Sequence, residues 1–315
     1  MYSIPITWVT TLRRIVAVAA LVSCLGLFSS AVLAQVKQSS FPSPETAAQT
    51  LVDAIKAKDR KAVLRILGPQ VKQWILSGDP VADAGAFRRF VEAYEQKHGM
   101  SKESDTKSTL LLGADDFPFP IPIVKSGNAW RFDAEQGKEE ILNRRIGRNE
   151  LSTIQVLLAI VDAQREYASV DRDGSGLLQY AQRLVSSPSK RDGLYWPTKA
   201  GEPESPMGPL VGRAAGQGYG KQNTGKPAPY HGYYFKILKA QGPNAPGGAY
   251  SYVARGKMIG GFAVLAYPAS YGNSGVKSFL VSHEGVVLEK DLGRNTAALA
   301  GQITRFNPDG TWKKI

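Results

Sequence analysis

The chain is poor in cysteine and histidine. Its 315 residues include one cysteine, Cys24, and three histidines, His98, His231 and His283. Because Cys24 lies in an N-terminal segment that we expect to be removed, the remaining chain can form neither a disulfide nor a cysteine-ligated metal site. The histidines lie in separate segments without metal-ligand spacing, so they give no zinc motif. An apolar core must therefore stabilise the fold, and a mature chain of about 280 residues is long enough to build one.

Long apolar runs are scarce and gather at the N-terminus. Two arginines precede the apolar residues 15–28, and small residues follow up to Ala34. This pattern predicts a signal peptide over residues 1–34, with cleavage after Ala34 and a periplasmic or secreted destination. Two alternatives stay open, namely lipidation of Cys24 and retention of residues 15–34 as a membrane anchor.

Acidic residues are fewer than basic ones, which leaves a net charge of +12. We expect no nucleic-acid partner for an exported protein. An anionic envelope component, or another envelope protein, is the expected class of partner. The basic residues are scattered along the chain, and this favours general solubility over a single basic binding tract. No glycine pair precedes a helix in a phosphate-binding pattern, so the sequence predicts no cofactor.

The first part of the mature chain predicts a small α+β domain. A polar leader over residues 35–43 precedes this domain, which we place at residues 44–135. Ser43 and Asp59 are suited to cap two helices, the second of which ends at a Gly-Pro pair. The further elements expected are an amphipathic helix over 84–98 with His98 at its C-terminal end, and strands over 108–112, 121–125 and 129–132, the last two joined by a turn at 126–128.

The second part, residues 136–315, predicts a long helix packed on an antiparallel sheet. Asn149 is suited to cap this helix, whose apolar residues cover much of its circumference. A short helix is expected over 180–185, and a Gly/Pro-rich insert without regular structure over 197–229. From His231 onward, aromatic and β-branched runs alternate with Gly, Pro and Asn, which is typical of an antiparallel meander. The fold class predicted for the chain is α+β.

Several phrases are similar to a known bacterial family. They are ILNRRIGRNELSTIQVLLAIVDAQREYA, SKRDGLYWP, GYYFKILKAQGPNAPGGAYSYVARGKMIGGFAVLAYPASYGNSGVKSFLV and KDLGRNT. On these phrases the chain resembles the domain-of-unknown-function family numbered 2950, over residues 41–312. The resemblance implies an exported bacterial protein, and it brings no catalytic residues to transfer.

Two further resemblances concern folds. The phrase AAQTLVDAIKAKDRKAVLRIL resembles the opening of cone-shaped α+β domains of the nuclear-transport-factor-2-like and cystatin-like kind, which implies a pocket between helix and sheet. The C-terminal helix, the GYYFKI strand and FAVLAYPASYGNSGVKSFLVSHEGVV resemble the globular part of type IV pilins and pseudopilins. A pilin carries a processed hydrophobic helix directly before this module, whereas here an α+β domain intervenes. The resemblance therefore implies a pilin-like fold rather than a filament subunit.

One phrase, DRDGSG, fits the start of a calcium loop. Asp171, Asp173 and Ser175 stand at loop positions one, three and five, but Gln182 occupies position twelve, where a bidentate glutamate is needed. A turn with Asx-type hydrogen bonds explains the same residues and is favoured. These three residues are therefore weak calcium candidates, and the sequence predicts no metal, cofactor-binding or catalytic residue with more support.

Aromatic residues supply the candidate contacts with a ligand or partner. Tyr195 and Trp196 stand at the start of the insert, and Tyr230 and His231 stand at its end. Large aromatic side chains at the border of such an insert suit stacking on a sugar or on an apolar partner side chain. Packing of Trp196 in the core, and a structural role for His231, are the favoured alternatives.

These observations favour a non-catalytic role in envelope-associated binding or assembly. The alternative is a periplasmic glycan or peptidoglycan hydrolase that uses a carboxylate pair. The carboxylates available for such a pair are Glu139 with Glu140, Asp171 with Asp173, and Asp192. A cleft that holds two carboxylates at catalytic separation would favour the hydrolase, and scattered acids would favour binding.

Overall fold

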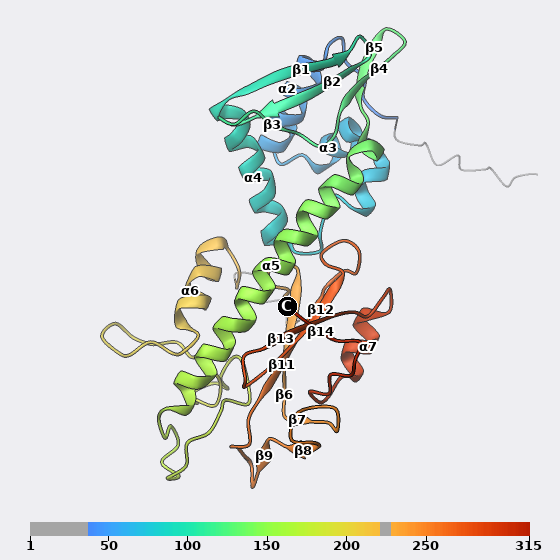
Figure 1. The fold of residues 1–315 in the computed structure, drawn as a ribbon. Coiled ribbons are helices and arrows are strands. Elements are labelled where there is room, and N and C mark those ends of the chain that lie inside the picture. Colours follow the sequence, from blue (N-terminus) through green and yellow to red (C-terminus); the bar gives the residue numbers. More distant parts are fainter. Residues whose placement is uncertain (1–36, 221–227) are drawn as a thin grey trace, which may run out of the picture. The chain divides into compact units, whose positions relative to one another are not determined.

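The computed structural model describes residues 37–220 and 228–315 (Figure 1). The predicted signal peptide, its cleavage site and Cys24 lie outside the described residues. Within the described residues, no helix combines the length and the apolar character needed to cross a membrane.

The first two helices begin at the caps that the sequence predicts. Helix α2, Pro44–Lys56, follows Ser43, whose Oγ accepts a hydrogen bond from the Thr46 amide at 3.2 Å. Helix α3, Arg60–Leu67, follows Asp59, which accepts from the Ala62 amide at 2.9 Å. Both predictions are confirmed, because each cap satisfies an amide that the helix itself leaves free. A short 3-10 helix, η1, then spans Pro69–Gln73.

Helix α4, Pro80–Gln96, differs at both ends from the predicted range of 84–98. It begins earlier because Asp79 caps it and Pro80 suits its first turn. The expectation that His98 ends this helix is wrong, because His98 is the first residue of strand β1. The imidazole of His98 nevertheless stays near the helix end, stacked on Tyr94 with ring centroids 3.8 Å apart.

An antiparallel sheet covers these helices, with strand order β1-β2-β4-β5 and β3 paired to β2. The strands are β1 (His98–Ser104), β2 (Lys107–Leu112), β3 (Phe117–Pro118), β4 (Ile123–Ser126) and β5 (Ala129–Phe132). The β2, β4 and β5 predictions are confirmed within two residues, and the predicted turn joins β4 to β5. Strand β1 is missed by the sequence because its residues are largely exposed and show no apolar alternation.

Helix α5 is one continuous helix, Ala134–Ala168, of 35 residues. Asp133 caps it, so the expectation that Asn149 starts a separate helix is wrong. Asn149 is buried in mid-helix, and its side-chain amide donates to the Ser274 carbonyl at 2.9 Å. The first turns of α5 pack on the core of α2–α4 and the first sheet, and the later turns pack on a second core. One helix therefore belongs to both cores.

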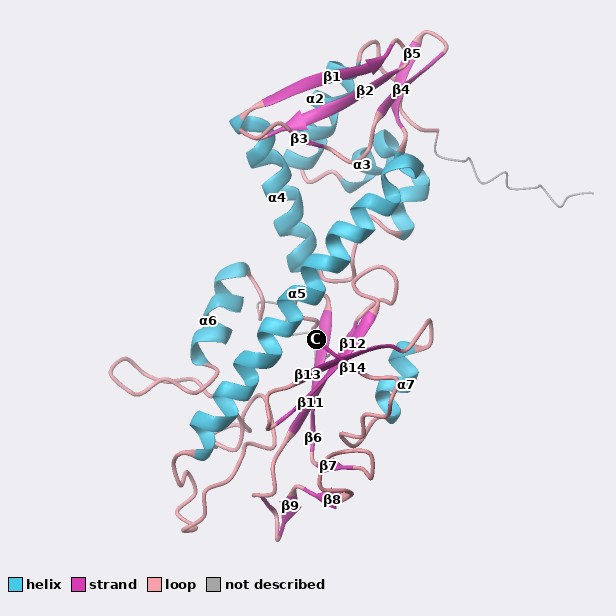
Figure 2. Ribbon diagram, viewed as in Figure 1, coloured by secondary structure: helices cyan, strands magenta, loops and turns pink. Residues whose placement is uncertain are grey.

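The second sheet is the predicted meander, with order β14-β13-β12-β11-β6 and antiparallel pairs throughout (Figure 2). Its strands are β6 (Tyr233–Leu238), β11 (Ala263–Pro268), β12 (Lys277–Ser282), β13 (Val287–Asp291) and β14 (Lys313–Lys314). Two-residue strands pair as β7 (Ala240–Gln241) with β8 (Tyr250–Ser251) and as β9 (Val253–Ala254) with β10 (Lys257–Met258), and helix α7 spans Thr296–Gln302. The α+β fold class is thus confirmed.

Two local predictions in this part are wrong. Residues 180–185 form no helix; instead Tyr180 and Val185 make isolated bridges to Met258 and Tyr195. The insert is not without regular structure, since helix α6 spans Gly208–Gln217 within it. Met207, just before α6, is buried in the second core. The apolar residues around α6 are too few and too widely spaced among glycines to give a clear helical period.

Candidate functional site

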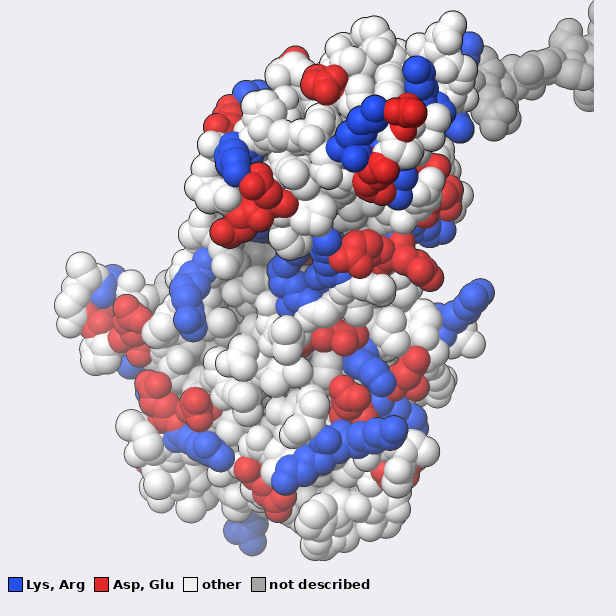
Figure 3. Space-filling view, turned by 45° about the horizontal axis from the view of Figure 1, so that its top comes forward, with Lys and Arg blue, Asp and Glu red and all other residues white. Residues whose placement is uncertain are grey.

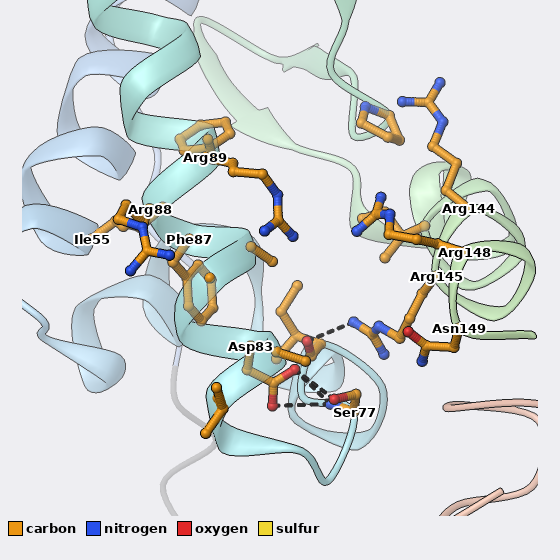
Figure 4. A pocket seen from close by; sticks show the side chains of 18 of the residues that line it. Ile55, Ser77, Asp83, Phe87, Arg88, Arg89, Arg144, Arg145, Arg148 and Asn149 are labelled. Carbon is orange, nitrogen blue, oxygen red and sulfur yellow. Dashed lines mark hydrogen bonds between the residues drawn. The ribbon is translucent and has the colours of Figure 1, made fainter. Parts of the chain in front are cut away.

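A cavity of about 650 Å³ lies between α4 and α5 (Figure 4). Its floor comes from the first core, where Leu51 of α2, Leu67 of α3 and Leu112 of β2 are 1%, 2% and 8% exposed. Residues 117–120 also line it, as do Tyr219 and His231, which precede the second sheet in the chain. Helices α4 and α5 therefore supply the walls, and the apolar interior supplies the base.

Arginines gather at the mouth of this cleft. Arg89 of α4 and Arg148 of α5 point towards each other across it in Figure 4, and basic side chains gather beside a hollow of the surface in Figure 3. The Arg89 guanidinium lies over Gly85, where a Cβ atom would stand 3.3 Å from Nη1. Partial burial lowers the pKa of Arg148, and the neighbouring charges of Arg89 and Arg144 lower it further. Arg148 therefore lies among like charges at the mouth of the cleft.

Ion pairing separates these arginines into two groups. Arg88 pairs with Glu92 at 3.7 Å, and Arg144 pairs with Glu140 at 2.5 Å. Arg144 also lies over the Phe117 ring, 4.4 Å from its centroid. Among the described residues, no carboxylate lies within 4.0 Å of the Arg89 or Arg148 guanidinium. These two guanidinium groups are the ones free to bind an anion, which they can do with paired N–H donors.

Arg145 has a structural role beside the cleft. Its guanidinium donates to the carbonyls of Trp74 and Ile75, at 2.7 Å each, and to the side chain of Asn273. The Asn273 amide in turn donates to the Leu76 carbonyl at 2.8 Å. Arg145 and Asn273 thereby attach the segment after η1 to α5 and to the loop between β11 and β12.

Asp79 makes a second connection close to the cleft, through Tyr219, which lines it. It is 1% exposed and accepts from the Val81 and Ala82 amides at the start of α4, at 3.1 and 3.0 Å. It also accepts from the Tyr219 hydroxyl at 2.7 Å and from the Gly232 amide at 3.1 Å. Burial and this hydrogen bond raise the pKa of Tyr219 far above its ordinary value. Asp79 is therefore fully engaged by donors of the chain itself.

Asp83 is the one carboxylate that lines the cleft among the described residues. Burial raises its pKa, against hydrogen bonds from the Ser77 amide at 3.0 Å and the Ser77 hydroxyl at 2.8 Å and against the nearby charge of Arg145. A lone carboxylate with these partners does not make the two-carboxylate arrangement that the hydrolase alternative requires. The other acids considered in the sequence lie elsewhere: Glu140 pairs with Arg144, and Asp192 accepts from the Ser187 amide at 2.7 Å.

Of the four aromatic candidates, His231 lies at the cleft. Its ring packs on Tyr230 with centroids 4.2 Å apart, and Tyr219 packs on both rings. Burial lowers the pKa of His231, while the charge of Asp79 opposes this shift. His231 also adopts a φ of 50°, a conformation that places its backbone amide towards the Tyr219 hydroxyl at 3.4 Å.

Tyr195 and Trp196 are not part of the cleft lining. Trp196 is 6% exposed in the second core, where the guanidinium groups of Arg172 and Arg191 lie over its ring at 5.2 and 5.5 Å. Tyr195 is half-buried and pairs through its backbone with Leu184 and Ser186. This burial agrees with the interpretation favoured from the sequence, that Trp196 packs in the core.

The DRDGSG phrase forms an Asx-type turn. Asp171 accepts from the Ser175 and Gly176 amides at 3.2 and 2.7 Å, and Asp173 pairs with Lys257. That ammonium group holds the pKa of Asp173 well below its usual range. Gln182 donates to the Gly256 carbonyl at 2.8 Å instead of turning towards the loop. Within the described residues, no group of three or more histidine, cysteine or acidic residues is placed to hold a metal.

The sequence missed the arginine pair because the two residues are far apart in the chain. Arg89 belongs to the helix predicted over 84–98, whereas Arg148 stands just before Asn149, the residue expected to cap the next helix. The basic residues are also scattered along the chain, a pattern that favours general solubility over a single binding tract. A usable signal is present: Arg144, Arg145 and Arg148 stand at helical spacing and so share one side of α5.

The comparisons with known proteins agree with the family resemblance. No curated protein and no solved structure matches the chain, so the likeness to pilins is not confirmed and the likeness to cone-shaped domains stays a prediction. The model of the family described as "protein of unknown function (DUF2950)" matches residues 38–315, and the chain belongs to that family.

Proposed function

We propose that the protein is an exported binding protein that holds an anionic ligand in the cleft between α4 and α5. The observation that carries this proposal is the facing pair Arg89 and Arg148, which has no carboxylate partner among the described residues. Holding like charges together costs free energy, and a bound oxyanion would remove that cost while accepting their N–H groups. An anionic component of the cell envelope is the class of ligand that fits an exported protein.

A binding role has more support than hydrolysis. The cleft lining offers Asp83 as its one carboxylate among the described residues, and Asp79, outside the lining, is occupied by four donors. Hydrolysis by a carboxylate pair needs one acid and one base or nucleophile on either side of a substrate.

The binding proposal is tested by titration calorimetry with ethyl phosphate, an oxyanion with little apolar surface. Arg89→Gln and Arg148→Gln should each weaken binding about tenfold, since each removes a charged donor pair. Arg131→Gln is the matched control, because Arg131 is an exposed arginine of β5 outside the cleft. Asp83→Asn should strengthen binding, because it removes the negative charge from the lining. Equal affinity in the wild type and both cleft variants would contradict the proposal.

The export part of the proposal rests on the N-terminal sequence. Mass spectrometry of the protein from its native cell should show Gln35 as the first residue. A lipid on Cys24 would contradict this cleavage and support processing as a lipoprotein. A chain that keeps residues 1–34 would support their retention as a membrane anchor.

A further inference from the structure

The cleft is deeper and more apolar than a site for a small inorganic anion needs to be. Leu51, Leu67 and Leu112 belong to the first core and yet line the cavity. Phe90 and Phe119, whose ring centroids lie 5.1 Å apart, also line the cavity, as do Ile55 and Ile141. A volume of about 650 Å³ lies in the range of sites for organic ligands rather than single ions.

Charge and apolar surface are separated along the depth of the cleft. The guanidinium groups of Arg89 and Arg148 lie at its mouth, and Arg88 and Arg144 flank them. Arg89 and Arg148 are exposed, whereas Leu51, Leu67 and Leu112 of the same lining are buried. Two other charged residues of the lining are held by the chain itself: Asp83 accepts from Ser77, and Arg145 donates to the Trp74 and Ile75 carbonyls. This order, with cations at the mouth and hydrocarbon beneath, is complementary to a molecule that has an anionic end and an apolar end.

Given that the cleft is the binding site proposed above, we propose that its ligand is an amphiphile with an oxyanion head group and a hydrocarbon chain. The phosphate or carboxylate head binds between Arg89 and Arg148. The chain enters the cleft and contacts Phe90, Phe119 and Ile55. Burial of the chain against the exposed faces of these side chains supplies affinity that the head alone does not have.

The chain-length dependence of binding tests this inference on the wild-type protein. Titration calorimetry compares ethyl phosphate, octyl phosphate and octyl glucoside, each below its critical micelle concentration. Each methylene that leaves water adds roughly fourfold in affinity, so octyl phosphate should bind at least about 100-fold more tightly than ethyl phosphate. Octyl glucoside carries the same chain without charge and should bind at least about tenfold more weakly than octyl phosphate.

Variants separate the head from the chain. Arg148→Gln should weaken both phosphates, whereas Phe119→Ala should weaken octyl phosphate and leave ethyl phosphate nearly unchanged, with Arg131→Gln as the control for both. If ethyl and octyl phosphate bind equally and both depend on Arg148, the anion site stands and the amphiphile inference is overturned. If octyl glucoside binds as tightly as octyl phosphate, or if no phosphate binds, the proposed anion-binding function fails as well. Because the chain-length series needs no substitution, it decides the question even where Phe119→Ala does not fold.

Discussion

One buried carboxylate, that of Asp79, connects three segments of the chain. It caps α4 through two amides, and it accepts from Tyr219 and Gly232, which are more than 100 residues further along the chain. A carboxylate has enough acceptor positions for all four donors, so its burial at 1% exposure leaves none of them unsatisfied. The sequence predicts this helix to begin at residue 84, so neither this cap nor the two distant donors follow from the sequence.

The first prediction compares this cap with an ordinary one. Asp79→Ala should lower the free energy of unfolding by about 3 kcal/mol, since it removes the cap and leaves two further buried donors without an acceptor. Asp59→Ala, at the exposed cap of α3, should cost about 1 kcal/mol. Urea unfolding of the two variants gives both values. Equal losses would mean that the bonds from Tyr219 and Gly232 do not stabilise the fold.

Asp83 leads to a prediction about pH. Because burial raises its folded-state pKa above the unfolded value, the folded state binds this proton more tightly. The contribution of Asp83 to stability is then fully present below about pH 4 and is lost as the pH rises through the folded-state pKa. Asp83→Asn cannot ionise, so its stability relative to the wild type should increase between pH 4 and pH 7. Urea unfolding at a series of pH values measures this difference, and a difference that decreases with pH would contradict the assigned direction.

At the scale of elements, α5 matters most because it belongs to both cores and carries three arginines on one side. Its two glycines have different surroundings. A Cβ at Gly137 would lie 2.6 Å from the Pro120 carbonyl oxygen, whereas nothing lies within 4 Å of the equivalent position at Gly147. Gly137 therefore permits the close approach of the 120–121 segment. Gly147 lowers the stability of the helix, and no neighbouring atom in the described structure requires a glycine there.

Gly147 serves as the matched control for Gly137, because both lie in α5. Gly147→Ala should raise the free energy of unfolding by about 0.5–1 kcal/mol, because it lowers the entropy of the unfolded chain and improves helix propensity. Gly137→Ala should lower it by about 1–3 kcal/mol, because the added methyl group meets backbone that cannot move aside easily. Urea unfolding of both variants checks the signs. A higher free energy of unfolding for Gly137→Ala would show that the 120–121 segment can move aside without loss of stability.

Sequence patterns predicted elements well where caps and alternation are local. Ser43, Asp59 and the β4–β5 turn are short-range signals, and the structure has all three. The patterns failed where the deciding contact is distant. Asn149 looks like a cap, yet it is buried in mid-helix against the Ser274 carbonyl. The cleft could not be derived for the same reason, because Arg89 and Arg148 meet only after α4 and α5 have packed.

At the scale of the whole described unit, the insert is part of the structure rather than an attachment to it. Met207 donates its amide to the Leu194 carbonyl at 3.0 Å, and its side chain is 8% exposed. Leu210 and Val211 of α6 pack against the same core. Tyr219, just after α6, reaches Asp79 at the start of α4. The insert thus contributes to the second core and to the contact that holds α4.

The last prediction follows from these contacts. Replacement of residues 203–219 by a Gly-Ser linker of equal length should lower the melting temperature by about 10 °C, because it removes the burial of Met207 and the Tyr219–Asp79 hydrogen bond. Met207→Ala alone should account for part of this decrease, whereas Leu178→Ala, at a leucine that is 59% exposed, should leave the melting temperature within about 1 °C. Differential scanning calorimetry of the three variants measures the decrease. If the linker variant melts within a few degrees of the wild type, these contacts of the insert do not stabilise the fold.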